Sequence, residues 1–171
     1  MRAWLILFVV LSIVANQVIA EEFVLQKSSD IRIITHISGS MKKNDPKNLR
    51  LPAGEMLSKL LPDGSKAGIW TFGEFVNMLV KHRGVDESWR LEAKAKSSGI
   101  SSLGQFTNIG EALEKAAYDK GYLATDQYQT HVILMTDGMV DIDRESSVNE
   151  RERSRIINEI LPSYQQSGFI I

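Results

Sequence analysis

The hydrophobic and polar positions of the chain alternate between two kinds of segment. Short runs rich in β-branched and other apolar side chains predict buried β-strands, and runs with an apolar side chain every three or four positions predict amphipathic helices. The predicted strands are residues 31–37, 66–72, 75–81, 131–136 and 168–171. The predicted helices are residues 52–61, 86–97, 108–117 and 147–161. This alternation predicts an α/β fold with a doubly wound, mostly parallel sheet and helices on both faces.

The connection between the second and third predicted strands fixes their relative direction. It consists of Gly73 and Glu74 alone. A connection that short can join only antiparallel neighbours, whereas parallel strands need a crossover of a dozen residues or more. Residues 75–81 are therefore expected to form an antiparallel strand at one edge of the sheet.

Capping pairs and helical spacing predict where two helices begin and which side chains they bury. The capping pairs are Asn108 with Glu111 and Ser147 with Glu150. The helix side chains at helical spacing, expected on the inner faces, are Ala53, Leu57, Leu60, Leu61, Ala112, Leu113, Ala116, Ala117, Ile156, Ile157, Ile160 and Leu161. Trp89 lies on an otherwise polar helix, where we interpret it as a packing anchor, with an exposed contact residue as the alternative.

The first 20 residues differ in composition from the rest. Arg2 is followed by an apolar run that a polar break interrupts at Asn16, and small side chains at Val18 and Ala20 suit a peptidase that cuts after residue 20. We interpret residues 1–20 as a signal peptide, with a retained membrane anchor as the alternative, residues 21–29 as a linker and residues 30–171 as one domain. The sequence therefore predicts an exported protein, periplasmic or secreted, with no transmembrane segment after the signal peptide.

Composition and charge exclude several classes of function. The chain has 20 basic and 21 acidic side chains and no cysteine. Without cysteine it has no disulfide framework, no thiol chemistry and no lipoprotein anchor. The balanced charge lacks the basic excess of a protein that binds nucleic acid, so we expect no nucleic-acid partner.

Small polar residues gather where predicted strands end. His36, Ser38 and Ser40 follow the first strand, Thr107 precedes a predicted helix, and Asp137 follows the strand at 131–136. In open α/β sheets, ligands bind beyond the carboxyl ends of the strands. We therefore expect the functional site at this edge of the sheet.

These three segments, in this order and context, resemble the metal-ion-dependent adhesion site of von Willebrand factor A domains, specifically those of exported bacterial proteins. The family pattern is Asp-x-Ser-x-Ser, a lone Thr, and an Asp in a strand-end Thr-Asp-Gly. The resemblance implies that Ser38, Ser40, Thr107 and Asp137 surround Mg²⁺ or Mn²⁺. It also implies a protein-binding module rather than an enzyme. A metal held mostly by neutral oxygens stays electrophilic, so a partner protein can supply an Asp or Glu carboxylate to it.

The sequence departs from the family pattern in two places. His36 stands where the family has aspartate, which removes a negative charge beside the metal and predicts weakened binding, with retained binding or a changed metal preference as alternatives. The chain also ends at Ile171, within the fifth strand, so the resemblance implies that a helix and an edge strand of the domain are missing. An unpaired sheet edge of this kind is expected to promote self-association.

Three further interpretations compete with a metal-dependent binding module. The first is a non-functional fragment with no working metal site. The second is a serine hydrolase, because Ser40 and Lys43 match Ser-x-x-Lys, although the companion Ser-Asp-Asn and Lys-Thr-Gly motifs are absent. The third is a calcium loop at residues 141–152, which has Ser146 where an EF-hand needs glycine. The three histidines of the chain lack the spacing of a zinc site.

Overall fold

The computed structural model describes residues 28–118 and 127–171. The predicted signal peptide and most of the predicted linker lie outside these residues. The four strands form one sheet in the order β3-β2-β1-β4, in which β1 is parallel to both β2 and β4 while β2 and β3 are antiparallel. In chain order they are β1 (Ser28–His36), β2 (Lys66–Phe72), β3 (Val76–Gly84) and β4 (Tyr128–Met135). The predicted antiparallel edge strand is confirmed.

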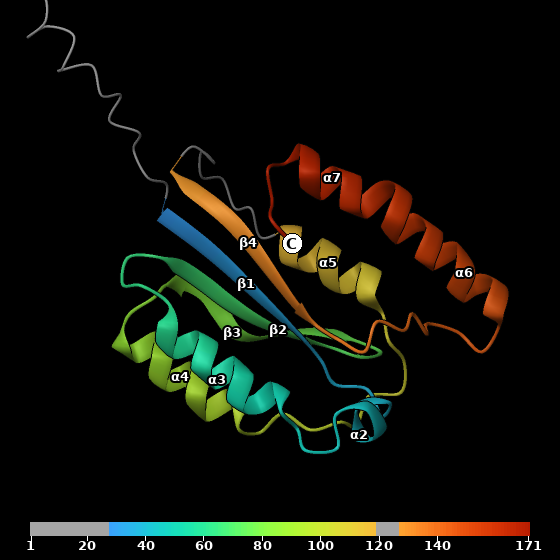
Figure 1. The fold of residues 1–171 in the computed structure, drawn as a ribbon, viewed down its shortest axis with the longest axis horizontal. Helices are drawn as coiled ribbons and strands as arrows, with labels where there is room; N and C mark the ends of the chain where they lie inside the picture. Colours follow the sequence, from blue (N-terminus) through green and yellow to red (C-terminus); the bar gives the residue numbers. More distant parts are fainter. Residues whose placement is uncertain (1–27, 119–126) are drawn as a thin grey trace, which may run out of the picture.

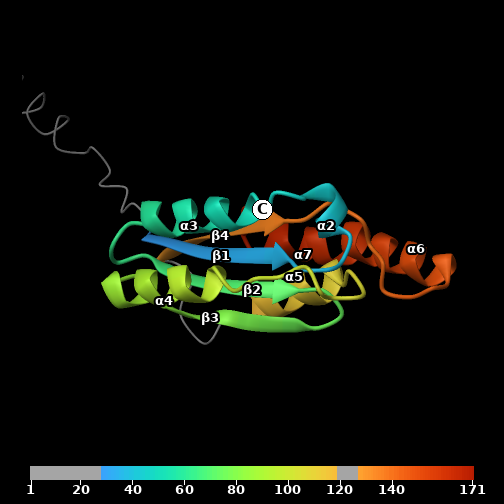
Figure 2. The ribbon, with the colours of Figure 1, turned by 90° about the horizontal axis from the view of Figure 1, so that it is seen from below.

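Helices cover both faces of the sheet, as predicted (Figures 1 and 2). α3 and α4 lie side by side on one face, and α5 lies on the other face together with a long helical segment in which a π-helical turn, η1, separates α6 from α7. The helices are α2 (Met41–Asn44), α3 (Arg50–Leu60), α4 (Glu87–Ser97), α5 (Ile109–Tyr118), α6 (Ser146–Arg155), η1 (Ile156–Ile160) and α7 (Leu161–Gln166).

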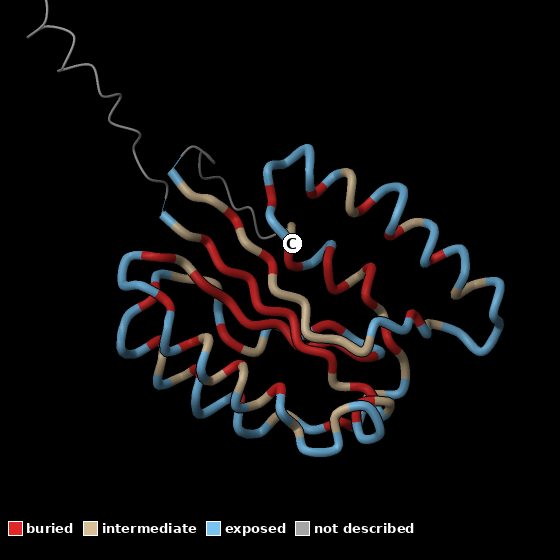
Figure 3. The backbone as a smooth tube through the Cα atoms, in the orientation of Figure 1, coloured by how far each residue is buried: buried red, intermediate tan, exposed pale blue. Residues whose placement is uncertain are grey.

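Each face of the sheet has its own hydrophobic core. On the α3 and α4 face, Ile33 and Ile69 pack with Trp89, which is fully buried, so the packing interpretation of Trp89 is confirmed. On the α5 face, Ile34 and Phe72 pack against α5 and against the end of the chain. The central strands are buried along almost their whole length, whereas the outer surfaces of the helices are exposed (Figure 3).

Two of the predicted core residues and one predicted cap are wrong. Leu60 is 68% exposed and Ile157 is 56% exposed, because both lie on the outer sides of their helices. The last helical segment begins at Ser146, one residue before the predicted cap Ser147, and no side chain caps it. The other capping prediction is confirmed, because the Asn108 side chain accepts a hydrogen bond from the Glu111 amide at 3.1 Å.

The end of the chain runs beside β4. Ile170 forms a single parallel bridge with His131, in which Val132 N–H donates to the Ile170 carbonyl at 2.7 Å and Ile170 N–H donates to the Thr130 carbonyl at 2.9 Å. Residues 168–171 therefore occupy the predicted place of a fifth strand but make only one bridge.

A buried polar cluster links three strands near the start of β1. Asp30 accepts hydrogen bonds from Arg32 at 2.9 Å and from Thr130 at 3.2 Å, and its other oxygen lies 2.6 Å from His82 Nε2. His82 comes from β3 and reaches Asp30 across β2, where a Cβ at Gly68 would lie 2.7 Å from the Trp70 ring and 3.0 Å from the His82 Cβ. The absence of a side chain at Gly68 thus leaves room for this contact.

The Asp30 carboxylate should contribute to acid stability. Burial alone would raise the pKa of Asp30, but hydrogen bonds from His82 and Arg32 outweigh burial and lower this pKa to about 2. A carboxylate whose pKa is lower in the folded state than in the unfolded state stabilises the protein at pH values above its unfolded-state pKa. This stabilisation is lost as the pH falls through the folded-state pKa. Between about pH 4 and pH 2, unfolding free energy should fall by about 2 kcal/mol more in the unmodified protein than in Asp30→Asn. Equal losses in denaturant titrations at the two pH values would contradict this role.

Candidate functional site

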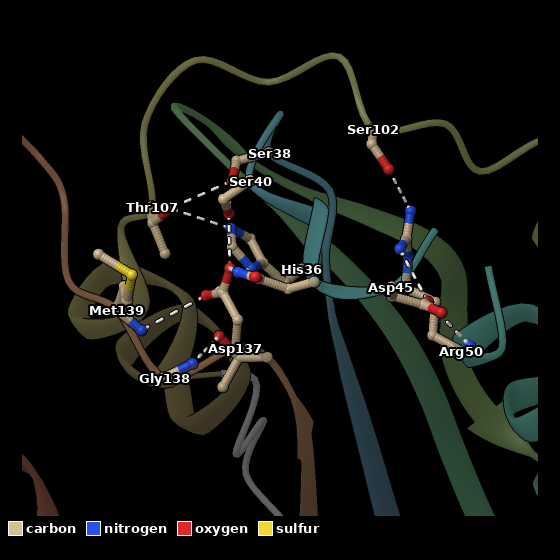
Figure 4. Close-up of polar contacts among 12 residues, drawn as sticks. His36, Ser38, Ser40, Asp45, Arg50, Ser102, Thr107, Asp137, Gly138 and Met139 are labelled. Atoms are coloured by element: carbon tan, nitrogen blue, oxygen red, sulfur yellow. Dashed lines mark hydrogen bonds and ion pairs between the residues drawn. The ribbon is translucent and has the colours of Figure 1, made fainter. Parts of the chain in front are cut away.

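The predicted site residues come together at the carboxyl edge of the sheet (Figure 4). β1 ends at His36 and leads through Ser38 and Ser40 into α2, while Thr107 lies two residues before α5. Asp137 lies two residues after β4, the parallel neighbour of β1. Because parallel neighbours end at the same edge, the sheet itself places these segments side by side.

Backbone hydrogen bonds hold the loops that carry these residues. The loop before α5 pairs with the first motif, since Gly39 N–H donates to the Gly104 carbonyl at 2.8 Å and Gly104 N–H donates to the Ile37 carbonyl at 3.0 Å. Thr107 N–H donates to the Asp141 carbonyl at 2.6 Å, which joins the same loop to the segment after β4. Backbone hydrogen bonds therefore connect the segments after β1, before α5 and after β4 to one another without a ligand.

The side chains of the site form one connected series of polar contacts. His36 Nε2 lies 2.9 Å from Thr107 Oγ1, and Thr107 Oγ1 donates to Ser38 Oγ at 3.2 Å. Ser38 Oγ lies 2.9 Å from Ser40 Oγ, which donates to Asp137 Oδ2 at 2.6 Å. All five predicted residues thus belong to a single cluster.

His36 is fully buried and stacks on Phe72, with ring centroids 4.9 Å apart and an interplanar angle of 16°. Its Nδ1 lies 3.4 Å from Asp137 Oδ1 and has no hydrogen-bond partner among the described residues. Burial lowers the pKa of His36; the Asp137 carboxylate opposes this shift and Arg50 adds to it. The net shift is downward, so the imidazole is neutral at pH 7.

Asp137 carries the negative charge of the site. Burial alone would raise its pKa, but hydrogen bonds from Ser40, Asn44 and the Met139 amide, together with the proximity of His36, lower it. The Asp137 side chain is only 6% exposed, and both of its oxygens face the cluster or the adjoining backbone. The site therefore presents one ionised carboxylate among neutral groups.

Two features of the site were not found by sequence reasoning. Asn44 Nδ2 donates to Asp137 Oδ2 at 2.9 Å, from the end of α2. Arg50 pairs with Asp45 at 3.0 Å and donates to Ser102, so it ties the start of α3 to the loop before α5. The Asn44–Asp137 and Arg50–Ser102 contacts join residues that are distant in sequence and carry no local motif, so the sequence pattern gave no signal for them.

The donor set comprises three hydroxyls, one carboxylate and one imidazole. Within residues 28–118 and 127–171, no group of three or more His, Cys, Asp or Glu side chains gathers in a way that could hold a metal ion. A cation at this site would therefore depend on hydroxyl oxygens and water as well as on His36 and Asp137. The role of the five residues as metal ligands stays a prediction.

No protein-family model matches the chain, and no curated protein matches its sequence. Solved structures do match it, each at full probability. A von Willebrand factor type A protein from Catenulispora acidiphila has a TM-score of 0.60 and 21% identity over 83% of this chain and 32% of its own. The von Willebrand factor domain of the type V pili tip protein Mfa5 from Porphyromonas gingivalis has a TM-score of 0.55 and 16% identity, over 67% of this chain and 39% of its own.

A third match is proximal thread matrix protein 1 from the mussel byssus, in a structure whose MIDAS motif, the metal-ion-dependent adhesion site, is occupied by zinc. It has a TM-score of 0.53 and 17% identity over 75% of this chain and 36% of its own. The chain thus has the fold of von Willebrand factor A domains, and it spans between 32% and 39% of the length of these three proteins. No helix in the described part of the chain is both long and apolar enough to cross a membrane.

Proposed function

We propose that this chain is a von Willebrand factor A-type binding module that uses a divalent cation to capture a carboxylate of a partner protein. The cation lies at the cluster formed by His36, Ser38, Ser40, Thr107 and Asp137, called the His36 cluster below. The observation that carries the proposal is the convergence of five predicted residues from three separate segments on one hydrogen-bonded cluster. A matching fold and a zinc-occupied motif in one structural neighbour support it.

The chemistry of the cluster suits capture of a carboxylate. Asp137 contributes one negative charge, and Ser38, Ser40 and Thr107 contribute neutral oxygens. A divalent cation in such surroundings keeps a net positive charge, so an Asp or Glu side chain from a partner completes its coordination. Binding of this kind makes and breaks no covalent bond, and the module is not an enzyme.

The serine hydrolase alternative has little support from the site. Ser40 Oγ donates to Asp137, whereas Lys43 is exposed on α2. A Ser-x-x-Lys nucleophile needs a base within hydrogen-bond reach of the hydroxyl. The hydroxyl of Ser40 is instead committed to a carboxylate that holds the cation in our proposal.

Mn²⁺ binding tests this function, because bound Mn²⁺ enhances the relaxation of water protons. The purified protein should bind Mn²⁺, and added acetate, a simple carboxylate probe, should displace water from the bound ion and reduce the enhancement. Asp137→Asn should weaken Mn²⁺ binding at least about tenfold. Glu74→Gln, which removes an exposed carboxylate in the turn after β2, should leave it unchanged. Equal Mn²⁺ affinity of the Asp137→Asn variant and the unmodified protein would contradict the proposal.

The module also functions outside the cytoplasm in our proposal. The basis is the apolar leader and the small residues at Val18 and Ala20. Structural neighbours that are a pilus tip protein and a byssal thread protein support an extracytoplasmic role. N-terminal sequencing of the exported protein should begin at Glu21. An intact Met1 on protein recovered from membranes would contradict export with cleavage.

A further inference from the structure

The hydrogen bonds of the site fix which nitrogen of His36 carries the proton. Each hydroxyl has one proton to donate. Ser40 donates its proton to the Asp137 carboxylate, so Ser38 must donate to Ser40. Thr107 donates its own proton to Ser38 and therefore has none left for His36. His36 Nε2 must then be the donor to Thr107 Oγ1, across 2.9 Å.

The other nitrogen of His36, Nδ1, is left with a buried lone pair that accepts no hydrogen bond from the described residues. A neutral imidazole has only one N–H, and in His36 the Nε2 position holds it. Nδ1 is buried, has no hydrogen-bond partner in the described residues, and faces Asp137 Oδ1 at 3.4 Å. Two acceptors that face each other inside a protein repel unless something positive lies between them.

The spacing of these two acceptors distinguishes between classes of cation. Two ligands of a tetrahedral zinc ion, at Zn–N and Zn–O distances of about 2.0–2.2 Å, lie about 3.4 Å apart. Adjacent ligands of octahedral Mg²⁺, at about 2.0–2.1 Å, lie about 2.9 Å apart. The observed separation of 3.4 Å matches the first value. Imidazole nitrogen is also a ligand that zinc accepts readily, whereas Mg²⁺ prefers oxygen.

We propose that His36 Nδ1 and Asp137 Oδ1 form a paired N,O ligand site that makes this module select zinc, or a similar nitrogen-accepting divalent cation, over Mg²⁺. The inference rests on the proposed function, because it concerns the same site. In this inference, the histidine that replaces the family aspartate at position 36 determines which metal the site selects. These two protein ligands would fill two of the four positions around a tetrahedral ion and leave two, one for water and one for the carboxylate of the partner.

Isothermal titration of the purified protein at pH 7.5 with ZnCl₂ and with MgCl₂ tests the selection. Zn²⁺ should bind at least about 100-fold more tightly than Mg²⁺. The His36→Gln variant keeps an amide donor for Thr107 but has no lone pair at the Nδ1 position, so Zn²⁺ affinity should fall at least about tenfold while Mg²⁺ affinity stays the same. His131→Gln, which removes a histidine on β4 away from the cluster, should leave Zn²⁺ binding unchanged.

The outcomes separate this inference from the proposed function. Unchanged Zn²⁺ affinity in His36→Gln, with binding still lost in Asp137→Asn, would overturn the zinc selection and leave the cation site standing, as would Mg²⁺ affinity equal to that for Zn²⁺. Absence of binding by either ion would overturn both. Long-range ¹H–¹⁵N correlation of the unmodified, metal-free protein gives a check that needs no variant. It should show the proton of His36 on Nε2, and a proton on Nδ1 would overturn the inference.

Discussion

A Trp89→Ala variant should lose about 3–5 kcal/mol of the free energy of unfolding, since truncating a buried tryptophan removes its apolar contacts and leaves a cavity. Trp89 has no exposed surface and packs with Leu61, Val80 and Ala93 between α4 and the sheet. Its backbone amide also donates to the capping carboxylate of Asp86 at 2.7 Å. A loss of this size approaches the whole stability of a small domain.

The matched control for Trp89 lies on the same helix. Leu91 is 60% exposed, so Leu91→Ala should change the unfolding free energy by less than about 1 kcal/mol. Urea titrations followed by far-UV circular dichroism measure both variants in the same way. Equal, small losses in the two variants would show that Trp89 contributes no more to the core than an exposed leucine.

The His36→Asp variant should bind Mg²⁺ roughly 10 to 100-fold more tightly than the unmodified protein, about 1.4 to 2.8 kcal/mol. The substitution replaces a neutral nitrogen ligand by a carboxylate, which adds attraction to the cation. A carboxylate at this position also accepts hydrogen bonds, so the Thr107 and serine hydroxyls can turn toward it and offer their lone pairs to the metal. Isothermal titration with MgCl₂ measures the gain directly.

The control for this gain is a second substitution at the opposite side of the cluster. Asp137→Ala in the His36→Asp background removes the only other charged ligand and should erase the increase in Mg²⁺ affinity. Thermal unfolding of both variants checks that the domain remains folded. Equal Mg²⁺ affinity in the unmodified protein and in His36→Asp would mean that position 36 does not face the cation.

Much of the fold follows from local features of the sequence. The short connection after β2, predicted as Gly73 and Glu74 and observed as residues 73–75, allows only an antiparallel pair, and β3 is indeed the antiparallel edge strand. The polar residues at the ends of β1 and β4 were predicted to meet because parallel neighbours end at one edge, and the structure places Ser40 within hydrogen-bond distance of Asp137. These features depend on short-range chemistry and on the handedness and layering that α/β folds share.

Other features depend on contacts that no local pattern encodes. Leu60 and Ile157 have core-like side chains at helical spacing, yet neighbouring elements leave them on the outer sides of their helices. The π-helical turn η1 within the last helical segment has no signature in its composition. The hydrogen bond of Asn44 to Asp137 and the orientation of His36 arise from tertiary packing, so sequence reasoning identified the position of His36 but not the direction of its nitrogens.

X-ray diffraction from crystals of the protein grown with ZnCl₂ shows whether the His36 cluster holds a divalent cation. Anomalous difference maps from data collected on both sides of the zinc absorption edge locate the ion without reference to any variant. One strong peak should lie between His36 Nδ1 and Asp137 Oδ1, about 2.0–2.2 Å from each. A map with no peak at this cluster, while zinc occupies other histidines of the chain, would contradict cation binding there.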